Sequence, residues 1–139
     1  MLDQFLNYQY SESLKKLGFS GNCFGYYLDG ILIPRKTKES DLLSGEKLDA
    51  PLFCQAIEWF KTKFDIPSYI STEWDNELEN YKYCYTYYLN KKGWISDSYF
   101  SEEKVAYALI ESLIKNVSEQ RKVYQRRSFN DDLARGLLD

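Results

Sequence analysis

The chain has 139 residues, of which 44% are hydrophobic and 28% are charged, so it is long enough to bury the core of one globular domain without disulfide or metal crosslinks. It contains no histidine, which excludes Ser-His and Cys-His nucleophilic catalysis and the Cys/His zinc sites. The net charge is only −3, no apolar run is long enough to span a bilayer, and no secretory leader is recognisable, so we expect a cytoplasmic protein.

The first part of the chain is predicted to form a helix followed by a β-hairpin. Apolar residues recur at helical spacing over residues 3–17, and Gly18 is placed to end that helix. Two short apolar runs then flank Asp29 and Gly30, the pair favoured in type I′ turns, which predicts a hairpin. The polar segment 35–48 is predicted to be a loop.

A second helix, three strands and a long helix are predicted to follow. Asp49 is the expected N-cap of the second helix, which ends before Pro67. Alternating side chains predict three antiparallel strands, at residues 68–74, 81–89 and 94–100. Ser101 is the expected N-cap of the long helix. The predicted fold class is α+β, in which an N-terminal helix and hairpin precede an α-β-β-β-α unit with the element order of double-stranded-RNA-binding domains.

Residues 121–139 are predicted to lie outside a single domain formed by residues 1–120. They begin as a basic linker and end in a short amphipathic helix, which docks on this domain, on a second copy or on a partner. The candidate partner-binding residues of this tail are Arg121, Lys122, Arg126, Arg127, Leu133, Leu137 and Leu138.

No catalytic, metal or cofactor motif is present in the sequence, so we expect a protein that is not an enzyme and needs no cofactor. The three cysteines are widely spaced without a CxxC pair, and no glycine-rich phosphate-binding motif occurs. Residues 65–120 hold ten acidic and five basic residues, and this acidic body suits a cationic partner. Its candidate partner-binding carboxylates are Asp75, Glu77, Glu79, Glu102 and Glu103; the first three also suit an ordinary solvated turn.

Nucleic-acid binding is a weaker alternative. Double-stranded-RNA-binding domains hold phosphates with lysines at the start of their last helix, where this chain has Glu102 and Glu103. A second route is an aromatic strand face, formed by Tyr81, Tyr83, Tyr85 and Tyr87. These alternating side chains can stack on bases, but they can equally pack under the helices, and we favour packing.

Several short aromatic patterns occur in a fixed order over residues 10–118: Gly18-Phe19, Cys23-Phe24 with Tyr26-Tyr27, and the segment APLFCQAIEWF that begins at Ala50. This order resembles a family of small proteins from Bacteroidota genomes, prophages and phages. The resemblance implies an accessory protein of a mobile element that acts inside a bacterial host cell. It implies no activity and no site residues.

Together these features predict a non-enzymatic protein that binds and inhibits a bacterial macromolecule. The most concrete form is an inhibitor of a nucleic-acid-guided defence nuclease, of the anti-CRISPR type, because an acidic surface complements a cationic nucleic-acid channel. The alternatives are an RNA- or DNA-binding protein that uses the tyrosine face and basic tail, and a self-assembling phage structural protein.

Overall fold

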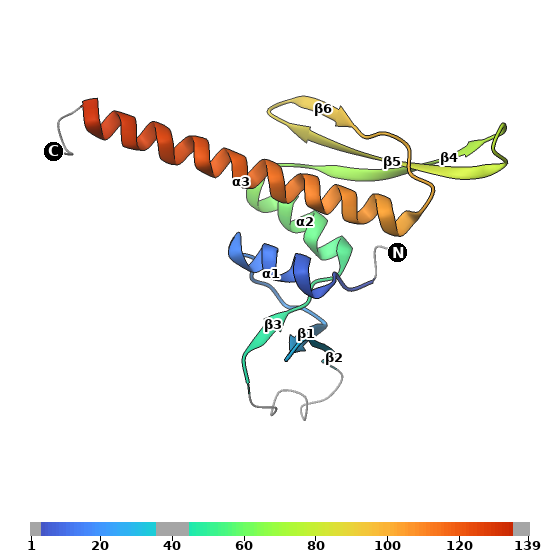
Figure 1. The fold of residues 1–139 in the computed structure, drawn as a ribbon, viewed down its shortest axis with the longest axis horizontal. Coiled ribbons are helices and arrows are strands. Elements are labelled where there is room, and N and C mark those ends of the chain that lie inside the picture. Colours follow the sequence, from blue (N-terminus) through green and yellow to red (C-terminus); the bar gives the residue numbers. More distant parts are fainter. Residues whose placement is uncertain (1–3, 36–44, 135–139) are drawn as a thin grey trace.

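A computed structural model of the protein describes residues 4–35 and 45–134, without the side chains of residues 124, 125 and 127–134. Within these ranges the chain forms three helices and two three-stranded antiparallel sheets, which confirms the predicted α+β class. We call the sheet with the longer strands the larger sheet and the other the smaller sheet. Figure 1 shows the larger sheet on one side of the helices and the smaller sheet on the other.

The smaller sheet has the strand order β2-β1-β3. Strands β1 (Gly25–Leu28) and β2 (Ile31–Pro34) form the predicted hairpin, and Asp29 and Gly30 both have positive φ angles, of 51° and 77°. These angles are what a type I′ turn requires. Strand β3 (Lys47–Asp49) pairs with β1, so the end of the expected loop 35–48 is a strand, while residues 36–44 lie outside the described residues.

Helix α1 (Tyr8–Lys16) begins later than the sequence predicts. The reason is that Asn7 caps it, accepting the Tyr10 N–H at 3.0 Å, while Phe5 pairs in extended form with Leu52. The helix ends at Gly18 as expected, with a φ angle of 97°.

Helix α2 (Phe53–Phe64) shows that the prediction of Asp49 as its N-cap is wrong. Asp49 is the last residue of β3, where its carboxylate accepts from the Arg35 guanidinium at 3.2 Å. At the start of α2 the Leu52 N–H instead donates to the side chain of Gln55 at 2.9 Å. The helix ends before Pro67, as predicted, with Asp65 in the left-handed conformation.

The larger sheet contains β4 (Ser68–Asp75), β5 (Asn80–Leu89) and β6 (Lys92–Ile95), in that order. The third strand is shorter than the predicted 94–100. The Ser96 N–H still donates to the Tyr85 carbonyl at 2.9 Å, but the chain then leaves the ladder and pairs with β5 again at Tyr99, opposite Tyr83. Strand pairing fixes the faces: Ile70 lies opposite Tyr85, on the face that packs against the helices.

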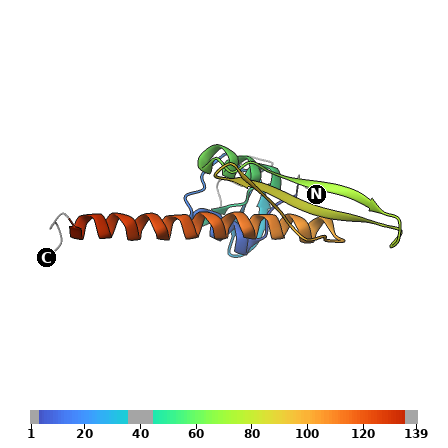
Figure 2. The same cartoon turned by 90° about the horizontal axis from the view of Figure 1, so that it is seen from above.

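Helix α3 (Glu102–Ala134) is continuous, so the prediction of a linker after residue 120 is wrong. Its start is as predicted, since Ser101 Oγ accepts the Lys104 N–H at 3.3 Å. No glycine or proline occurs between residues 102 and 134, and nothing in the sequence therefore interrupts the helix. Figures 1 and 2 show its C-terminal half extending away from the rest of the fold.

The main core is formed where the three helices meet the inner face of the larger sheet. Its fully buried side chains include Leu14 of α1, Phe60 of α2 and Leu113 of α3, and Ile70 and Tyr85 of the sheet pack against them. Among the described side chains of α3, the last buried one is Val117. A smaller cluster of Tyr27, Leu48 and Ala50 holds the smaller sheet.

Candidate partner-binding surfaces

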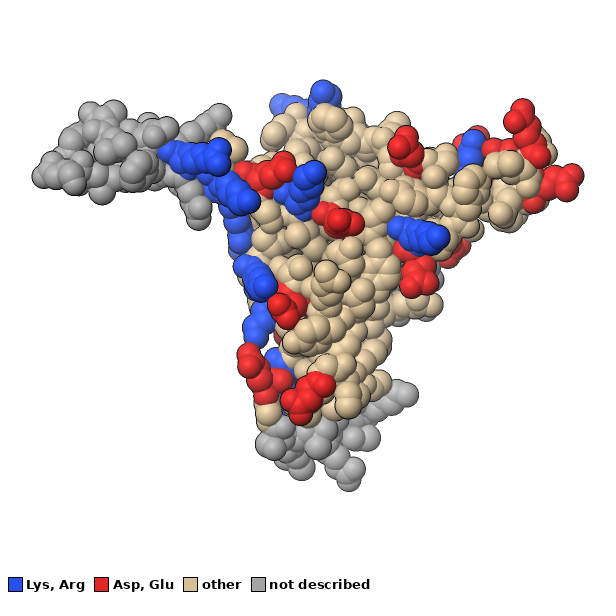
Figure 3. Space-filling view, in the orientation of Figure 1, with Lys and Arg blue, Asp and Glu red and all other residues tan. Residues whose placement is uncertain are grey.

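The β4–β5 hairpin extends beyond the N-terminal end of α3, as Figures 1 and 2 show. Its end, which we call the hairpin tip, comprises residues 73–81 and carries the carboxylates of Glu73, Asp75, Glu77 and Glu79. Acidic side chains gather there in Figure 3. The tip also presents large apolar side chains to solvent, since Trp74, Leu78 and Tyr81 are 48%, 60% and 51% exposed.

The carboxylates of the hairpin tip have different roles. Asp75 Oδ1 accepts the N–H groups of Leu78 at 3.1 Å and Glu77 at 2.9 Å, and Lys82 Nζ lies 3.7 Å from Asp75 Oδ2. These contacts, with the Leu78 hydrogen bond as the largest contribution, lower the pKa of Asp75. Asp75 therefore holds the turn, whereas Glu77 and Glu79 are exposed on it.

The rings of Trp74 and Tyr81 are in contact across the hairpin. The two residues are paired in the β4–β5 register, and their ring centroids lie 5.0 Å apart in an edge-to-face arrangement. This contact stiffens the end of the hairpin while leaving both rings about half exposed. The tip thus offers aromatic area and negative charge on a short, ordered protrusion.

Glu102 and Glu103, the other predicted acidic residues, are exposed in the first turn of α3. Negative charge is favourable at a helix N-terminus, which explains their position without any partner. Figure 1 shows the start of α3 on the same side of the molecule as the hairpin tip. The predicted carboxylates therefore occupy one end of the fold, in two separate groups.

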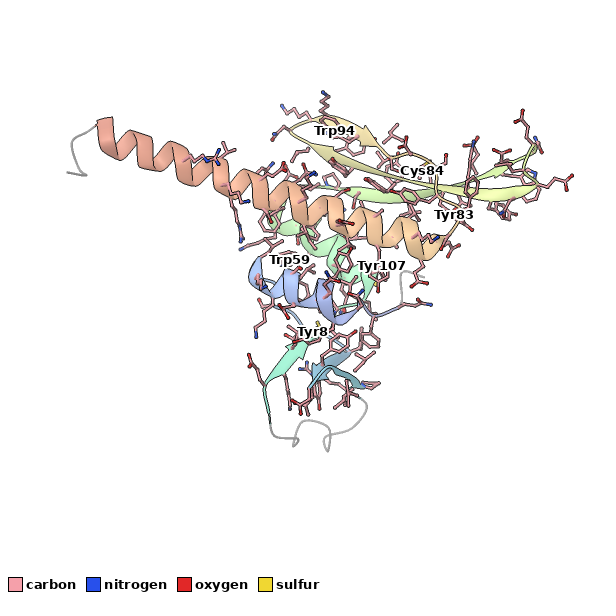
Figure 4. The ribbon with its side chains drawn as sticks, in the orientation of Figure 1. Tyr8, Trp59, Tyr83, Cys84, Trp94 and Tyr107 are labelled. Atoms are coloured by element: carbon pink, nitrogen blue, oxygen red, sulfur yellow. The ribbon has the colours of Figure 1, made fainter. Side chains whose placement is uncertain are left out.

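The predicted tyrosine face is divided between core and solvent. Tyr85 OH lies 2.7 Å from Ser112 Oγ of α3, and Tyr87 OH accepts from Asn116 Nδ2 of α3 at 3.1 Å. The two rings stack on each other at 6.2 Å and are partly buried. Tyr83 is also partly buried, and Figure 4 shows it near the start of α3; only Tyr81, at the tip, is exposed. Packing under the helices is the role of Tyr85 and Tyr87.

The opposite face of this sheet carries exposed apolar side chains that the sequence analysis did not single out. Tyr69, Tyr88 and Ile95 are 51%, 41% and 77% exposed, and strand pairing places all three on the face away from the helices. A side-chain hydrogen bond with Tyr69 raises the pKa of Tyr88. Alternation along β4 and β5 places Tyr69 and Tyr88 on this face, but polar and charged residues such as Glu73 and Lys82 lie between them. The sequence pattern of this face is therefore that of an ordinary solvated face.

The predicted tail residues do not form one surface. The Arg121 guanidinium donates to the Leu17 carbonyl at 2.7 Å and lies 5.5 Å over the Phe64 ring, so Arg121 joins α3 to the ends of α1 and α2. Lys122 and Arg126 are exposed. Arg127 and Leu133 belong to α3, but their side chains are not described, and Leu137 and Leu138 lie outside the described residues.

A basic end forms around Arg121, and it includes lysines of α1 and α2 that the sequence pattern did not single out. The last turns of α1 and α2 bring Lys15, Lys16, Lys61 and Lys63 to the helix ends that Arg121 contacts. Figure 3 shows basic side chains along this side of the molecule, remote from the acidic hairpin tip. Some of this charge is neutralised locally, since Lys15 pairs with Glu46 at 3.5 Å and Lys16 with Glu12 at 3.1 Å.

The described residues include few features of a small-molecule or metal site. Within residues 4–35 and 45–134, no group of three acidic or cysteine side chains is arranged to hold a metal ion. A hollow of about 530 Å³ lies between α1 and the smaller sheet, lined by residues such as Tyr8, Lys15, Tyr27 and Leu48, and it is open to solvent. No helix in the described part of the chain has the length and apolarity to cross a membrane.

Comparison with protein-family models, curated proteins and solved structures finds no match to this chain. The resemblance to the family from Bacteroidota and their phages therefore stays a prediction.

Proposed function

We propose that this chain is a non-enzymatic accessory protein of a phage or mobile element that binds a bacterial macromolecule through its acidic hairpin tip. The most concrete target is a defence nuclease, inhibited in the anti-CRISPR manner by occupation of its cationic nucleic-acid channel. One observation carries the proposal: the β4–β5 hairpin presents exposed Glu77 and Glu79 beside exposed Trp74 and Tyr81 on a protrusion.

The chemistry of the tip favours a cationic protein groove. Carboxylates on a protrusion bring negative charge close to arginine and lysine side chains that otherwise bind phosphates, which speeds association and selects partners. Aromatic rings then supply apolar contact area, and tyrosine and tryptophan are the residue types enriched at interface centres. The Asp75 hydrogen bonds hold the turn in place before binding, which lowers the entropy cost of association.

The same observations disfavour the nucleic-acid alternative. Tyr85 and Tyr87 use their hydroxyl groups in contacts with α3, so a flat run of four stacking rings is not available. Glu102 and Glu103 stand where phosphate-binding lysines are needed.

The test is inhibition of nuclease cleavage, using a panel of purified guide-RNA-loaded bacterial nucleases and a labelled DNA target. Glu77→Lys with Glu79→Lys reverses the charge of the tip. The matched control is Glu58→Lys with Glu119→Lys, which makes the same change in net charge at exposed positions in α2 and α3. We expect the native chain and the control to inhibit cleavage, and the tip variant to inhibit about tenfold less or worse.

Equal losses in the tip variant and the control would contradict a role for the tip, because net charge alone would then explain binding. Absence of inhibition across the panel would reject the nuclease as target. Circular dichroism and melting of each variant establish that the hairpin still folds.

A further inference from the structure

The outer edge of β4 is unlike every other strand edge in the described part of the fold. Strand β4 is an edge strand of eight residues, and it pairs with β5 from Ser68 to Asp75 without a bulge. It contains no proline, lysine or arginine. The other edge strands have at most four residues, and each contains a lysine or proline: Pro34 in β2, Lys47 in β3 and Lys92 in β6. Short length, proline and charged side chains, above all lysine, keep edges from pairing. Strand β4 is long, has no proline or lysine, and carries charge only toward its end, at Glu73 and Asp75.

Hydrogen bonds around β5 identify the backbone groups on this edge. Tyr83 exchanges backbone hydrogen bonds with Tyr99, at 2.7 and 2.8 Å, on the side away from β4, whereas the Tyr88 N–H donates to the Pro67 carbonyl at 3.0 Å on the β4 side. In an antiparallel ladder the bonded residues alternate. Tyr69, Ser71 and Glu73, which lie opposite Thr86, Cys84 and Lys82, therefore bond to β5. The alternate residues Ile70, Thr72 and Trp74 direct their N–H and C=O groups outward.

This edge is open to another chain. Thr72 and Trp74 are exposed, and Figure 2 shows β4 along the margin of the sheet, where none of the other described strands lies beside its outer edge. Backbone groups at such an edge are ready to pair with an extended segment.

We propose that the segment is β4 of a second copy of this chain, paired antiparallel about a twofold axis at Ser71. This register places Ile70 against Thr72 of the other copy in hydrogen-bonded pairs, and all residues from 68 to 74 take part. Both copies keep their helices on the same side of one continuous six-stranded sheet, because paired residues in an antiparallel ladder share a face.

The charges of β4 favour this self-pairing. Glu73 is the only charged residue between Ser68 and Trp74, and the twofold register puts it opposite Tyr69 of the other copy instead of another carboxylate. In this register the acidic C-terminal end of each β4 lies beside the N-terminal end of the other copy's β4. That N-terminal end comes shortly after α2, whose last turn carries Lys61 and Lys63. The paired residues include Glu73 and Trp74 of the hairpin tip, but Glu77 and Glu79 lie in the turn beyond them. The dimer is tested by mass and amide exchange, and the proposed function by nuclease inhibition, so the failure of one is distinguishable from the failure of the other.

The test combines solution mass with the exchange of individual amide hydrogens in the full chain. Sedimentation velocity from low-micromolar to near-millimolar concentration is expected to show a monomer-to-dimer transition. In the dimer the amides of Ile70, Thr72 and Trp74 should gain protection from hydrogen exchange, while those of Tyr69, Ser71 and Glu73 are protected in monomer and dimer alike.

Thr72→Pro removes one outward N–H from each copy and leaves the β4–β5 ladder bonds in place, so it should yield a monomer. Thr72→Val keeps the N–H and should remain a dimer. If Thr72→Pro does not fold, the amide exchange of the native chain decides alone. A monomer at every concentration, or a dimer whose outward β4 amides exchange as in the monomer, would overturn the proposal.

Discussion

At the scale of single residues, the environment and not the residue type decides the chemistry, and the cysteines show this clearly. Cys54 is exposed on α2, whereas Cys23 is only 6% exposed beside the smaller sheet. Desolvation, assisted by the nearby Asp49 and opposed by Arg35, raises the pKa of the Cys23 thiol to about 11. Each cysteine has apolar or aromatic neighbours in the sequence, which favours burial as a small apolar side chain. Cys23 is buried as this pattern predicts, whereas Cys54 is exposed.

Because of this shift, the free energy of unfolding should fall as the pH rises from about 9 to about 11. In that range the unfolded thiol loses its proton while the folded Cys23 thiol keeps it, so the unfolded state binds fewer protons and stability decreases with pH. The contribution is at most about 2 kcal/mol. Denaturant unfolding at a series of alkaline pH values measures it. Cys23→Ala should flatten the slope near pH 9, and Cys54→Ala should leave it unchanged. If Cys23→Ala and Cys54→Ala gave the same slope, the loss of stability at alkaline pH would come from tyrosines and not from Cys23.

At the scale of elements, α3 is divided by Arg121 into a packed part and an extended part. The last described buried side chain is Val117, one turn before Arg121 reaches Leu17 and Phe64. Beyond it, Lys122, Val123 and Arg126 are exposed. Helix propensity continues α3 past this point, because no residue breaks it, but packing with the domain ends at Arg121 among the described side chains.

Two truncations should therefore behave differently. Ending the chain after Val123 should leave the free energy of unfolding nearly unchanged, whereas ending it after Glu119 should lower it by about 1–2 kcal/mol through loss of the Arg121 hydrogen bond and cation–π contact. Arg121→Ala in the full chain should reproduce most of that loss, and Lys122→Ala should not. Urea denaturation at constant m-value measures the differences. A large loss on ending the chain after Val123 would instead place stabilising contacts in the distal part of α3.

At the scale of the whole molecule, charge is separated along the longest dimension. The hairpin tip and the first turn of α3 are acidic, and the ends of α1 and α2 beside Arg121 are basic, as Figure 3 shows for one face. A net charge of −3 hides this separation. Separated charge orients a partner and directs it to one end of the molecule.

Duplex RNA should bind this chain only weakly, because the start of α3 repels phosphates. We expect a dissociation constant weaker than about 1 μM for generic duplex RNA at physiological salt, as fluorescence polarisation would show. Glu102→Lys with Glu103→Lys should tighten binding by restoring positive charge at this position. Binding by the native chain tighter than about 1 μM at physiological salt would contradict the electrostatic argument, and a steep loss of that binding with added salt would support the basic end as an RNA site.

The sequence by itself determined the local features, because these depend on a few neighbouring residues. Asp29 and Gly30 set the first turn, Ser101 begins α3, Gly18 ends α1, and alternation in residues 68–89 gives the β4–β5 hairpin with its acidic turn. Each is fixed by backbone preference or by a hydrogen bond within a few residues.

Only the tertiary structure decided which of these features remain available to a partner. Asp49 looked like a helix cap but pairs with Arg35, fourteen residues away, and Arg121 looked like part of a linker but binds Leu17, more than a hundred residues away. Tyr81 and Tyr85 belong to the same alternating run of tyrosines, yet α3 covers Tyr85 and leaves Tyr81 exposed. Local preference cannot distinguish these outcomes, since burial depends on which distant element packs against a face, and that is settled by the folding of the whole chain.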